Sequence, residues 1–338
     1  MQTDLDPKVK LLRHYERVKG IIEGKFLPPL MVDIDVYEGP CNLDCVWCSQ
    51  AVSRRCVKRA VMPVETMKKL GPFSRSWGIK AWKIAGLSEP VLNPHIDVLL
   101  HSGYDNGIDM GMTTNGVLID RIRNINKLTW LGISLDATTA KTWSLLKKSP
   151  ERNFHGIIDN IRKIRTKYPD LDISIKYCRW SSSIHPDKEK FYPDIRRLNG
   201  KDFKVLKKHD NYDDAEKLPD LARSLGCDYI LHDAFPSDFP KLYKFEKCLV
   251  TPLEGVFGAD HKFHLCCDAR NVYVLTDDYT RNGWKELPSI WGSKKHKDLI
   301  KKINPQKCLG CSKWKMCSVF ENIILDGKFT KDYQVNFI

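Results

Sequence analysis

Three cysteines near the start of the chain have the type and spacing needed to hold a metal cluster. Cys41, Cys45 and Cys48 follow a C-x3-C-x2-C pattern directly after an apolar alternating run over residues 31–37. Thiolates on one short loop can take three corners of an iron–sulfur cube, and the fourth iron then has no protein ligand. An open metal position is typical of catalysis rather than of structural support. The loop therefore predicts a cluster that binds a small chelating molecule.

Structural zinc is the alternative for this loop. Such sites usually take four ligands, often as two C-x2-C pairs. The triple has no fourth cysteine or histidine at hand, and Cys56, further along, has no assigned role. Zinc therefore fits the loop less well than a cluster does.

A second group of cysteines lies in the last third of the chain. Cys248 is followed by the pair Cys266 and Cys267, and then by the run Cys308-x2-Cys311-x5-Cys317. The chain has 12 cysteines and no secretion signal, so we expect a cytoplasmic location and no disulfides. Cys178 and Cys227 sit in apolar settings and are interpreted as small buried residues.

Strands and helices alternate through the first two thirds of the sequence. Apolar runs predict strands over residues 31–37, 79–84, 108–112, 130–135, 173–177 and 229–232, and helical spacing predicts helices over 11–22, 63–70, 96–102, 153–168 and 218–225. Such alternation predicts an α/β fold with a parallel sheet. Six units favour a partial (β/α)6 TIM-like barrel with a small C-terminal cluster-binding extension.

Polar motifs follow several of these strands. They are Gly86-Leu-Ser-Glu-Pro90, Thr113-Thr-Asn-Gly116 and the pair Ser134 and Asp136. In (β/α) barrels the reactive groups gather at the carboxyl ends of the strands. We therefore expect these motifs to meet at one mouth, next to the cysteine loop.

The predicted strands, helices and cysteine groups divide the chain into three segments. Residues 1–29 form an N-terminal extension, residues 30–235 the barrel with a charged insertion over 181–214, and residues 236–330 the extension that carries the later cysteines.

Composition restricts the class of protein. Hydrophobic residues make up 42% of 338, which predicts a packed core, and no apolar run reaches the roughly 20 residues of a membrane span. The net charge of +13 either marks a polyanionic partner such as RNA or reflects a lysine-rich solvated surface. Acidic residues are interspersed among the basic ones, and no RNA-recognition motif is present. We therefore favour the solvated surface and expect neither a membrane nor a nucleic acid partner.

The cysteine triple at the end of a first strand, with Trp47 before its third cysteine, resembles the radical S-adenosylmethionine (radical SAM) superfamily. The resemblance spans about residues 30–235. It implies a [4Fe–4S] cluster on Cys41, Cys45 and Cys48 that binds S-adenosylmethionine (SAM). It also implies SAM contacts from the motifs above. Candidates for these contacts are Trp47, Gly86, Ser88, Glu89, Asn115, Ser134, Asp136 and Lys176. Leu87-Ser88 stands where the family usually has a second glycine.

The tail is similar to the twitch and SPASM extensions of the same superfamily, which carry auxiliary clusters. The longer form continues with further cysteines, but residue 321 is Glu and no cysteine follows Cys317. The resemblance thus implies one auxiliary [4Fe–4S] cluster on Cys248, Cys266, Cys308 and Cys311, with Cys267 or Cys317 as substitutes. The unused cysteine is either an inert neighbour or a thiol that donates a hydrogen atom. Zinc on Cys308 and Cys311 is the alternative.

Enzymes of this kind oxidise an alcohol or amine carbon of carbohydrate-like or peptide substrates, and take electrons from a donor such as flavodoxin or ferredoxin. We therefore expect a radical SAM oxidoreductase. The alternatives are a peptide- or sugar-modifying epimerase or maturase and, from another class, a non-catalytic metal-binding module that contacts RNA. The sequence assigns no catalytic residue and no substrate.

Overall fold

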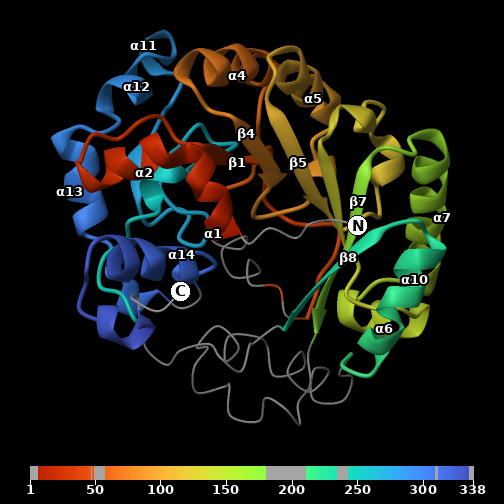
Figure 1. The fold of residues 1–338 in the computed structure, drawn as a ribbon. Coiled ribbons are helices and arrows are strands. Elements are labelled where there is room, and N and C mark those ends of the chain that lie inside the picture. Colours follow the sequence, from red (N-terminus) through yellow and green to blue (C-terminus); the bar gives the residue numbers. More distant parts are fainter. Residues whose placement is uncertain are drawn as a thin grey trace.

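A computed structural model describes residues 7–46, 48, 58–179, 211–233, 243–308 and 311–334. Trp47, Cys56 and residues 181–210 of the predicted insertion lie outside these ranges. The described chain is built on one sheet of nine strands in the order β11-β10-β9-β1-β4-β5-β6-β7-β8 (Figure 1). A separate two-stranded sheet pairs β2 (Tyr37–Glu38) with β3 (Ala60–Val61).

Six parallel strands in sequence order form the curved body of the sheet. They are β1 (Met31–Asp35), β4 (Ala81–Ala85), β5 (Asp109–Thr114), β6 (Trp130–Ser134), β7 (Asp172–Arg179) and β8 (Asp228–Asp233). All six were predicted from the sequence. The fold is therefore α/β with a partial TIM-like barrel, as expected.

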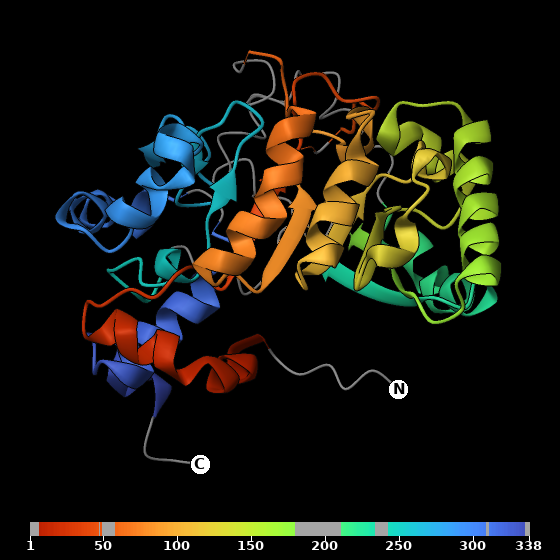
Figure 2. The same ribbon diagram turned by 90° about the horizontal axis from the view of Figure 1, so that it is seen from above.

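Helices cover the outer face of this sheet (Figures 1 and 2). The main ones are α4 (Val64–Trp77), α5 (Ile96–Asp105), α6 (Ala140–Lys147), α7 (Glu151–Lys167) and α10 (Leu218–Ser224). Short 3-10 turns complete the crossovers at η2 (Pro90–Leu92), η3 (Ile119–Arg121), η4 (Ile125–Lys127) and η6 (Asp214–Lys217). Helix α6 was not predicted, because it is only eight residues long and is flanked by the loop-like residues Thr138, Thr139, Ser149 and Pro150.

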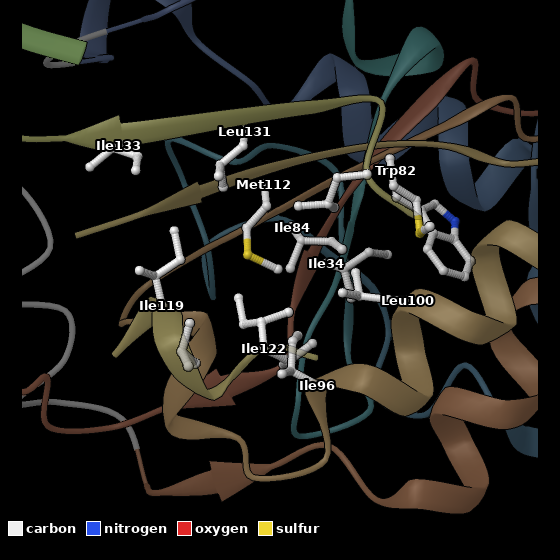
Figure 3. Packing of buried hydrophobic residues seen from close by; sticks show 14 of the residues in the cluster. Ile34, Trp82, Ile84, Ile96, Leu100, Met112, Ile119, Ile122, Leu131 and Ile133 are labelled. Carbon is white, nitrogen blue, oxygen red and sulfur yellow. The ribbon is translucent and has the colours of Figure 1, made fainter. Parts of the chain in front are cut away.

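The barrel strands alternate between an apolar outer face and a polar inner face. The outward side chains pack against the helices, as Figure 3 shows for Ile34, Trp82, Ile84, Met112, Leu131 and Ile133 with Ile96 and Leu100 of α5. The residues between them point to the other face and include Asp33, Lys83, Gly111 and Trp130. Parallel strands covered on both faces are usually apolar throughout. The inner face of this barrel therefore serves a purpose other than packing.

The tail extends the same sheet beyond β1. Strand β9 (Val256–Phe257) pairs with β1 in parallel, and β10 (Phe263–His264) and β11 (Val274–Thr276) follow antiparallel. Further short helices are η7 (Thr251–Leu253), α11 (Arg281–Trp284), α12 (Glu286–Ile290), α13 (Lys294–Lys301), η8 (Pro305–Lys307), α14 (Trp314–Ser318), the π-helical turn η9 (Val319–Ile324) and η10 (Thr330–Tyr333). The tail thus continues the barrel sheet through β9.

The N-terminal helices lie against the end of the tail (Figure 2). These are α1 (Pro7–Lys10), η1 (Leu11–His14) and α2 (Tyr15–Ile22). Leu11, Val18 and Ile21 form a buried cluster with residues of the tail that include Phe245 and Phe320. A helix over 11–22 was predicted, and its first turn is 3-10. Within the described part of the chain, no helix is long and apolar enough to cross a membrane.

Two glycines test how closely the helices pack. A Cβ on Gly71 of α4 would collide with the carbonyl of Ser102 on α5, whereas a Cβ on Gly156 of α7 would meet nothing within 4 Å. We expect Gly71→Ala to lower the free energy of unfolding by about 1–3 kcal/mol through overpacking. Gly156→Ala should raise it by about 0.5–1 kcal/mol, because alanine favours helix. Denaturant unfolding of both variants measures this, and equal stabilities would contradict the α4–α5 contact.

Candidate functional site

The cysteine loop begins after β2, at the carboxyl end of the first barrel strand. The Cys48 amide donates a hydrogen bond to the Cys45 carbonyl (3.2 Å), which forms a turn between two of the three thiols. The Val46 amide donates to the Leu146 carbonyl of α6 (3.0 Å) and so anchors the loop to the barrel. The loop is thereby fixed at the mouth, where the sequence placed it.

Glu89 and Asn115 connect this loop to the ends of β4 and β5. The buried Glu89 carboxylate accepts hydrogen bonds from the Thr114 hydroxyl (2.6 Å) and the Asn115 amide (2.8 Å). The Asn115 side-chain amide reaches the sulfur of Cys41 (3.9 Å) and the Asn42 side chain (2.8 Å). Asn115 therefore lies beside the first cysteine, and Glu89 holds the backbone of Asn115 in place.

Gly86 and Ser88 line the segment between β4 and Glu89. Gly86 has φ +135°, and a Cβ there would collide with the carboxylate of Asp35. The segment thus approaches β1 more closely than other residues allow. The hydroxyls of Ser88 and of Thr113 on β5 are buried and, in the described structure, make no hydrogen bond. Buried polar atoms without partners are rare in folded proteins and suit contacts to a ligand.

Asp136 and Lys147 form a buried ion pair behind Cys45, with side chains 9% and 4% exposed. Asp136 has φ 60° and also accepts a hydrogen bond from the Cys178 amide (2.7 Å). Burial raises the pKa of the Cys45 thiol to about 11, against the opposing effect of the Lys147 ammonium. Burial would lower the pKa of Lys147, but Asp136 and Cys45 raise it above its ordinary value. Lys147 thus favours a thiolate at Cys45.

Ser134 and Lys176 face each other in register on β6 and β7. The Lys176 ammonium lies 5.8 Å from the centre of the Trp130 ring. Burial, together with the charge of Lys83, lowers the pKa of Lys176. Both predicted residues thus lie near the mouth of the barrel, on its inner face.

These residues fit the expected cluster and SAM in the chemistry of their donors. Three thiols share one loop, and unpartnered hydroxyls and a fixed amide stand next to it. Among the described residues, no three His, Cys, Asp or Glu side chains are close enough to coordinate one metal ion. Each thiolate of a [4Fe–4S] cluster ligates a different iron, so its ligands stand farther apart than those of a single ion.

The tail thiols gather around Cys248. It hydrogen-bonds the buried Cys317 thiol. Burial, aided by the charge of Cys248, raises the pKa of Cys308. Burial raises the pKa of Cys311 to about 12, and Asp268, Cys248 and Cys308 add to the effect. Four cysteines from two segments therefore lie close enough to interact.

Two carboxylates fix the segments that carry these thiols. Asp268 accepts hydrogen bonds from the amide and the hydroxyl of Ser312, both 2.7 Å, which joins the Cys266–Cys267 pair to Cys311. Glu321 accepts from the amides of Glu246 (2.9 Å) and Lys247 (2.6 Å), just before Cys248. Glu321 thus holds the segment that leads into Cys248.

Two of the residues that hold this region together were not predicted from the sequence. Lys147 lies on α6, where the buried spacing of Trp143, Leu146 and Lys147 is helical and could have placed it inside. Arg270 donates hydrogen bonds to both oxygens of Asp35 (2.6 and 2.9 Å) and to Asp33 (3.2 Å). Arg270 and Asp35 are 235 residues apart in the sequence, and no local pattern predicts such a contact.

Lys147 supports a prediction about the loop. We expect Lys147→Met to lower the free energy of unfolding by about 3–5 kcal/mol, because Asp136 stays buried without its cation. Lys141→Met, at an exposed position of the same helix, should change it by less than about 0.5 kcal/mol. Urea unfolding of the cluster-free chain under reducing conditions measures both. A loss of similar size in both variants would show that the buried pair has no special role.

Glu38 supports a prediction about pH. It accepts a hydrogen bond from the Ala259 amide (2.9 Å), and burial, with the charges of Asp260 and Asp35, raises its pKa to about 7. The folded chain therefore binds the Glu38 proton more tightly than the unfolded chain does. The protonated carboxyl raises the free energy of unfolding at low pH, and this contribution is lost as pH rises through about 7.

We expect Glu38→Gln to gain stability over the wild type by on the order of 2 kcal/mol between pH 5 and pH 8. Denaturant unfolding of the cluster-free chain at several pH values measures this. Glu65→Gln at an exposed position is the control. A constant difference between Glu38→Gln and the wild type would mean that Glu38 titrates normally.

Comparisons with known proteins identify the family of the region that carries the cysteine loop. Residues 40–177 match the family model described as "Radical SAM superfamily". Over 146 residues the chain is 27% identical to a probable GTP 3',8-cyclase of Methanocaldococcus jannaschii, covering 40% of this chain and 48% of that protein. The chain thus spans about half the length of this curated relative.

Among solved structures, SuiB of Streptococcus suis has a similar fold. The structure of SuiB bound to the precursor peptide SuiA superposes with a TM-score of 0.54 at 16% identity, and the match covers 89% of this chain and 73% of SuiB. SuiB alone gives a TM-score of 0.50. At this identity the likeness concerns the fold. Through its cysteine motif and the match over residues 40–177, this part of the chain is a radical SAM domain.

Proposed function

We propose that this radical SAM enzyme cleaves SAM reductively, abstracts a hydrogen atom from its substrate and oxidises an alcohol or amine carbon. The substrate is carbohydrate-like or a peptide. The observation that carries the proposal is the joining of Cys41, Asn115 and Glu89 by hydrogen bonds at the barrel mouth. These residues come from three separate segments, and a common ligand gives them a reason to meet.

The cluster would be held by Cys41, Cys45 and Cys48, and when bound with SAM it supplies the one-electron chemistry that yields a hydrogen-abstracting radical. The chain itself positions SAM and the substrate and shields the radical. The unpartnered hydroxyl of Ser88 and the backbone from Gly86 would bind the methionine end of SAM. Ser134 and Lys176 are candidates for contacts to the ribose and the carboxylate.

Two predicted contacts have structural partners that shape their role. The carboxylate of Asp136 is paired with Lys147 and the Cys178 amide, and that of Glu89 with Thr114 and Asn115. We therefore infer that both orient the groups around SAM, in addition to any direct contact.

The tail would hold one auxiliary [4Fe–4S] cluster on Cys248, Cys266, Cys308 and Cys311. Such a cluster suits net oxidation, because it can accept the second electron from the substrate. Electrons for the SAM cluster would come from a donor such as flavodoxin or ferredoxin. Cys317, which hydrogen-bonds Cys248, is the substitute ligand, and zinc is the alternative metal.

A second candidate function is epimerisation or peptide maturation. Cys267 is buried near Lys83 of the barrel and Arg270 of the tail, whereas Cys317 lies in the core of the tail. A thiol next to the barrel suits hydrogen-atom donation to a substrate radical. SuiB, of similar fold, was solved with a precursor peptide.

A non-catalytic module that contacts RNA is the alternative from another class. Helix α13 presents Lys294, Lys295, Lys297 and Lys301. The need for solubility is enough to explain these lysines. The RNA-binding hypothesis does not explain the buried hydrogen bonds of Glu89.

Anaerobic reconstitution separates these functions. We expect about eight irons per chain, and formation of 5′-deoxyadenosine when SAM and a strong reductant are added. Cys45→Ala should abolish that product, because the SAM cluster loses a ligand, while Cys227→Ala, outside both cysteine groups, should keep it. Zinc alone, or cleavage that survives Cys45→Ala, would refute the proposal.

The auxiliary site has its own test. Replacing Cys308 and Cys311 by Ala should lower the iron content by about half and leave uncoupled cleavage of SAM measurable. Cys267→Ala then divides the two reactions: it keeps turnover if Cys267 is an inert neighbour, and stops product formation but not SAM cleavage if it donates hydrogen. An unchanged iron content in the double variant would refute the auxiliary cluster.

A further inference from the structure

The space enclosed by the barrel strands is lined by polar and small residues. Counting alternate positions inward gives Asp33 and Asp35 on β1, Lys83 on β4, Gly111 and Thr113 on β5, Trp130, Gly132 and Ser134 on β6, and Ser174 and Lys176 on β7. A barrel that serves only as a core is filled by bulky branched side chains. This lumen is therefore built to take a polar ligand.

The charges in the lumen do not balance. Arg270 takes both oxygens of Asp35. The same oxygen of Asp33 serves Arg270 (3.2 Å) and Lys83 (3.5 Å). Within the described ranges, no carboxylate lies within ion-pairing distance of Lys176. Three cations thus share two carboxylates, and one positive charge is left over.

The two lysines face the same space. The charge of Lys83 acts on Lys176, because it helps burial to lower the pKa of Lys176. Burial would lower the pKa of Lys83, but the charge of Asp33 raises it, so Lys83 keeps its charge. Its side chain is 37% exposed although it points into the barrel. An accessible cation beside an unpaired one attracts an anion.

Trp130 forms the floor of this space. Cβ atoms on Gly111 or Gly132 would collide with its ring, and one on Gly132 would also come within 3.0 Å of the Lys176 side chain. The indole NH donates to the Ser174 hydroxyl (3.2 Å), which fixes the ring. The two glycines therefore let a large flat side chain lie across the lumen, with Lys176 beside it.

We propose that the substrate carries an anionic group, a carboxylate or a phosphate, which binds between Lys83 and Lys176 above the ring of Trp130. This proposal rests on the proposed function only in calling the ligand the substrate. The anion supplies the missing negative charge, and both ammonium groups can donate charge-assisted hydrogen bonds to it. This proposal assigns Lys176 to the substrate in place of the SAM carboxylate, which then binds nearer to the cysteine loop.

The test is a calorimetric titration of the reconstituted chain at low ionic strength, with inorganic phosphate and with malonate as probes. We expect binding of at least one probe, and a rise in its Kd of about tenfold or more in Lys83→Gln and in Lys176→Gln. Lys83→Arg keeps the charge and should stay within about threefold of the wild type. Lys301→Gln at an exposed position should bind like the wild type.

The titration is repeated with saturating SAM. Binding that persists supports a separate substrate site, and the tighter probe identifies the group as phosphate or carboxylate. Competition by SAM, or equal Kd values in the wild type and both glutamine variants, would overturn the proposal. SAM cleavage is measured on the same samples. Anion binding without cleavage would refute the proposed function and leave this site standing, and cleavage without anion binding would do the reverse.

Discussion

The ion pair of Arg270 with Asp35 and Asp33 joins the two halves of the molecule. Asp35 ends the first barrel strand, six residues before Cys41, and Arg270 follows Cys266 by four. Burial would lower the pKa of Arg270, but Asp35 and Asp33 raise it above its ordinary value. A buried arginine with three hydrogen bonds to carboxylates has little freedom, because each lost contact leaves a charge buried and unpaired. The pair therefore sets the distance between the cysteine loop and the tail thiols.

The sheet reinforces this connection. Strand β9 pairs with β1 directly, so the tail is attached to the barrel by backbone hydrogen bonds as well as by charge. Phe257 of β9 and Phe263 of β10 continue the apolar outer face of the barrel strands and pack against Phe73 and Trp77 of α4. An extension that is continuous in this way moves with the barrel. Electron exchange between the proposed auxiliary cluster and a substrate in the lumen would therefore take place across a fixed distance.

The barrel was predictable because its signals are local. Each strand is a short apolar run, each long helix has a buried stripe such as Phe154, Ile157, Ile158 and Ile161, and the polar motifs follow the strands at once. The positions of the cysteine loop, Glu89 and Asn115 at the strand ends were predictable for the same reason. The bonds of Glu89 to the end of β5, the Lys147 pair and the Arg270 contacts could not be predicted, because each depends on which strands become neighbours. The tail strands were missed because two or three residues carry no periodicity.

Lys147 and Asp136 decide how readily the Cys45 thiol becomes a metal ligand. A thiol must lose its proton to bind a metal, and burial opposes this at Cys45. Lys147 offsets part of that cost, yet Asp136 holds Lys147 and so limits how much of its charge reaches the sulfur. Removing Asp136 would increase the attraction between Lys147 and Cys45, but it would also release the Cys178 amide and the end of β7. Cys45 is thus a buried thiol held close to a cation that favours its thiolate.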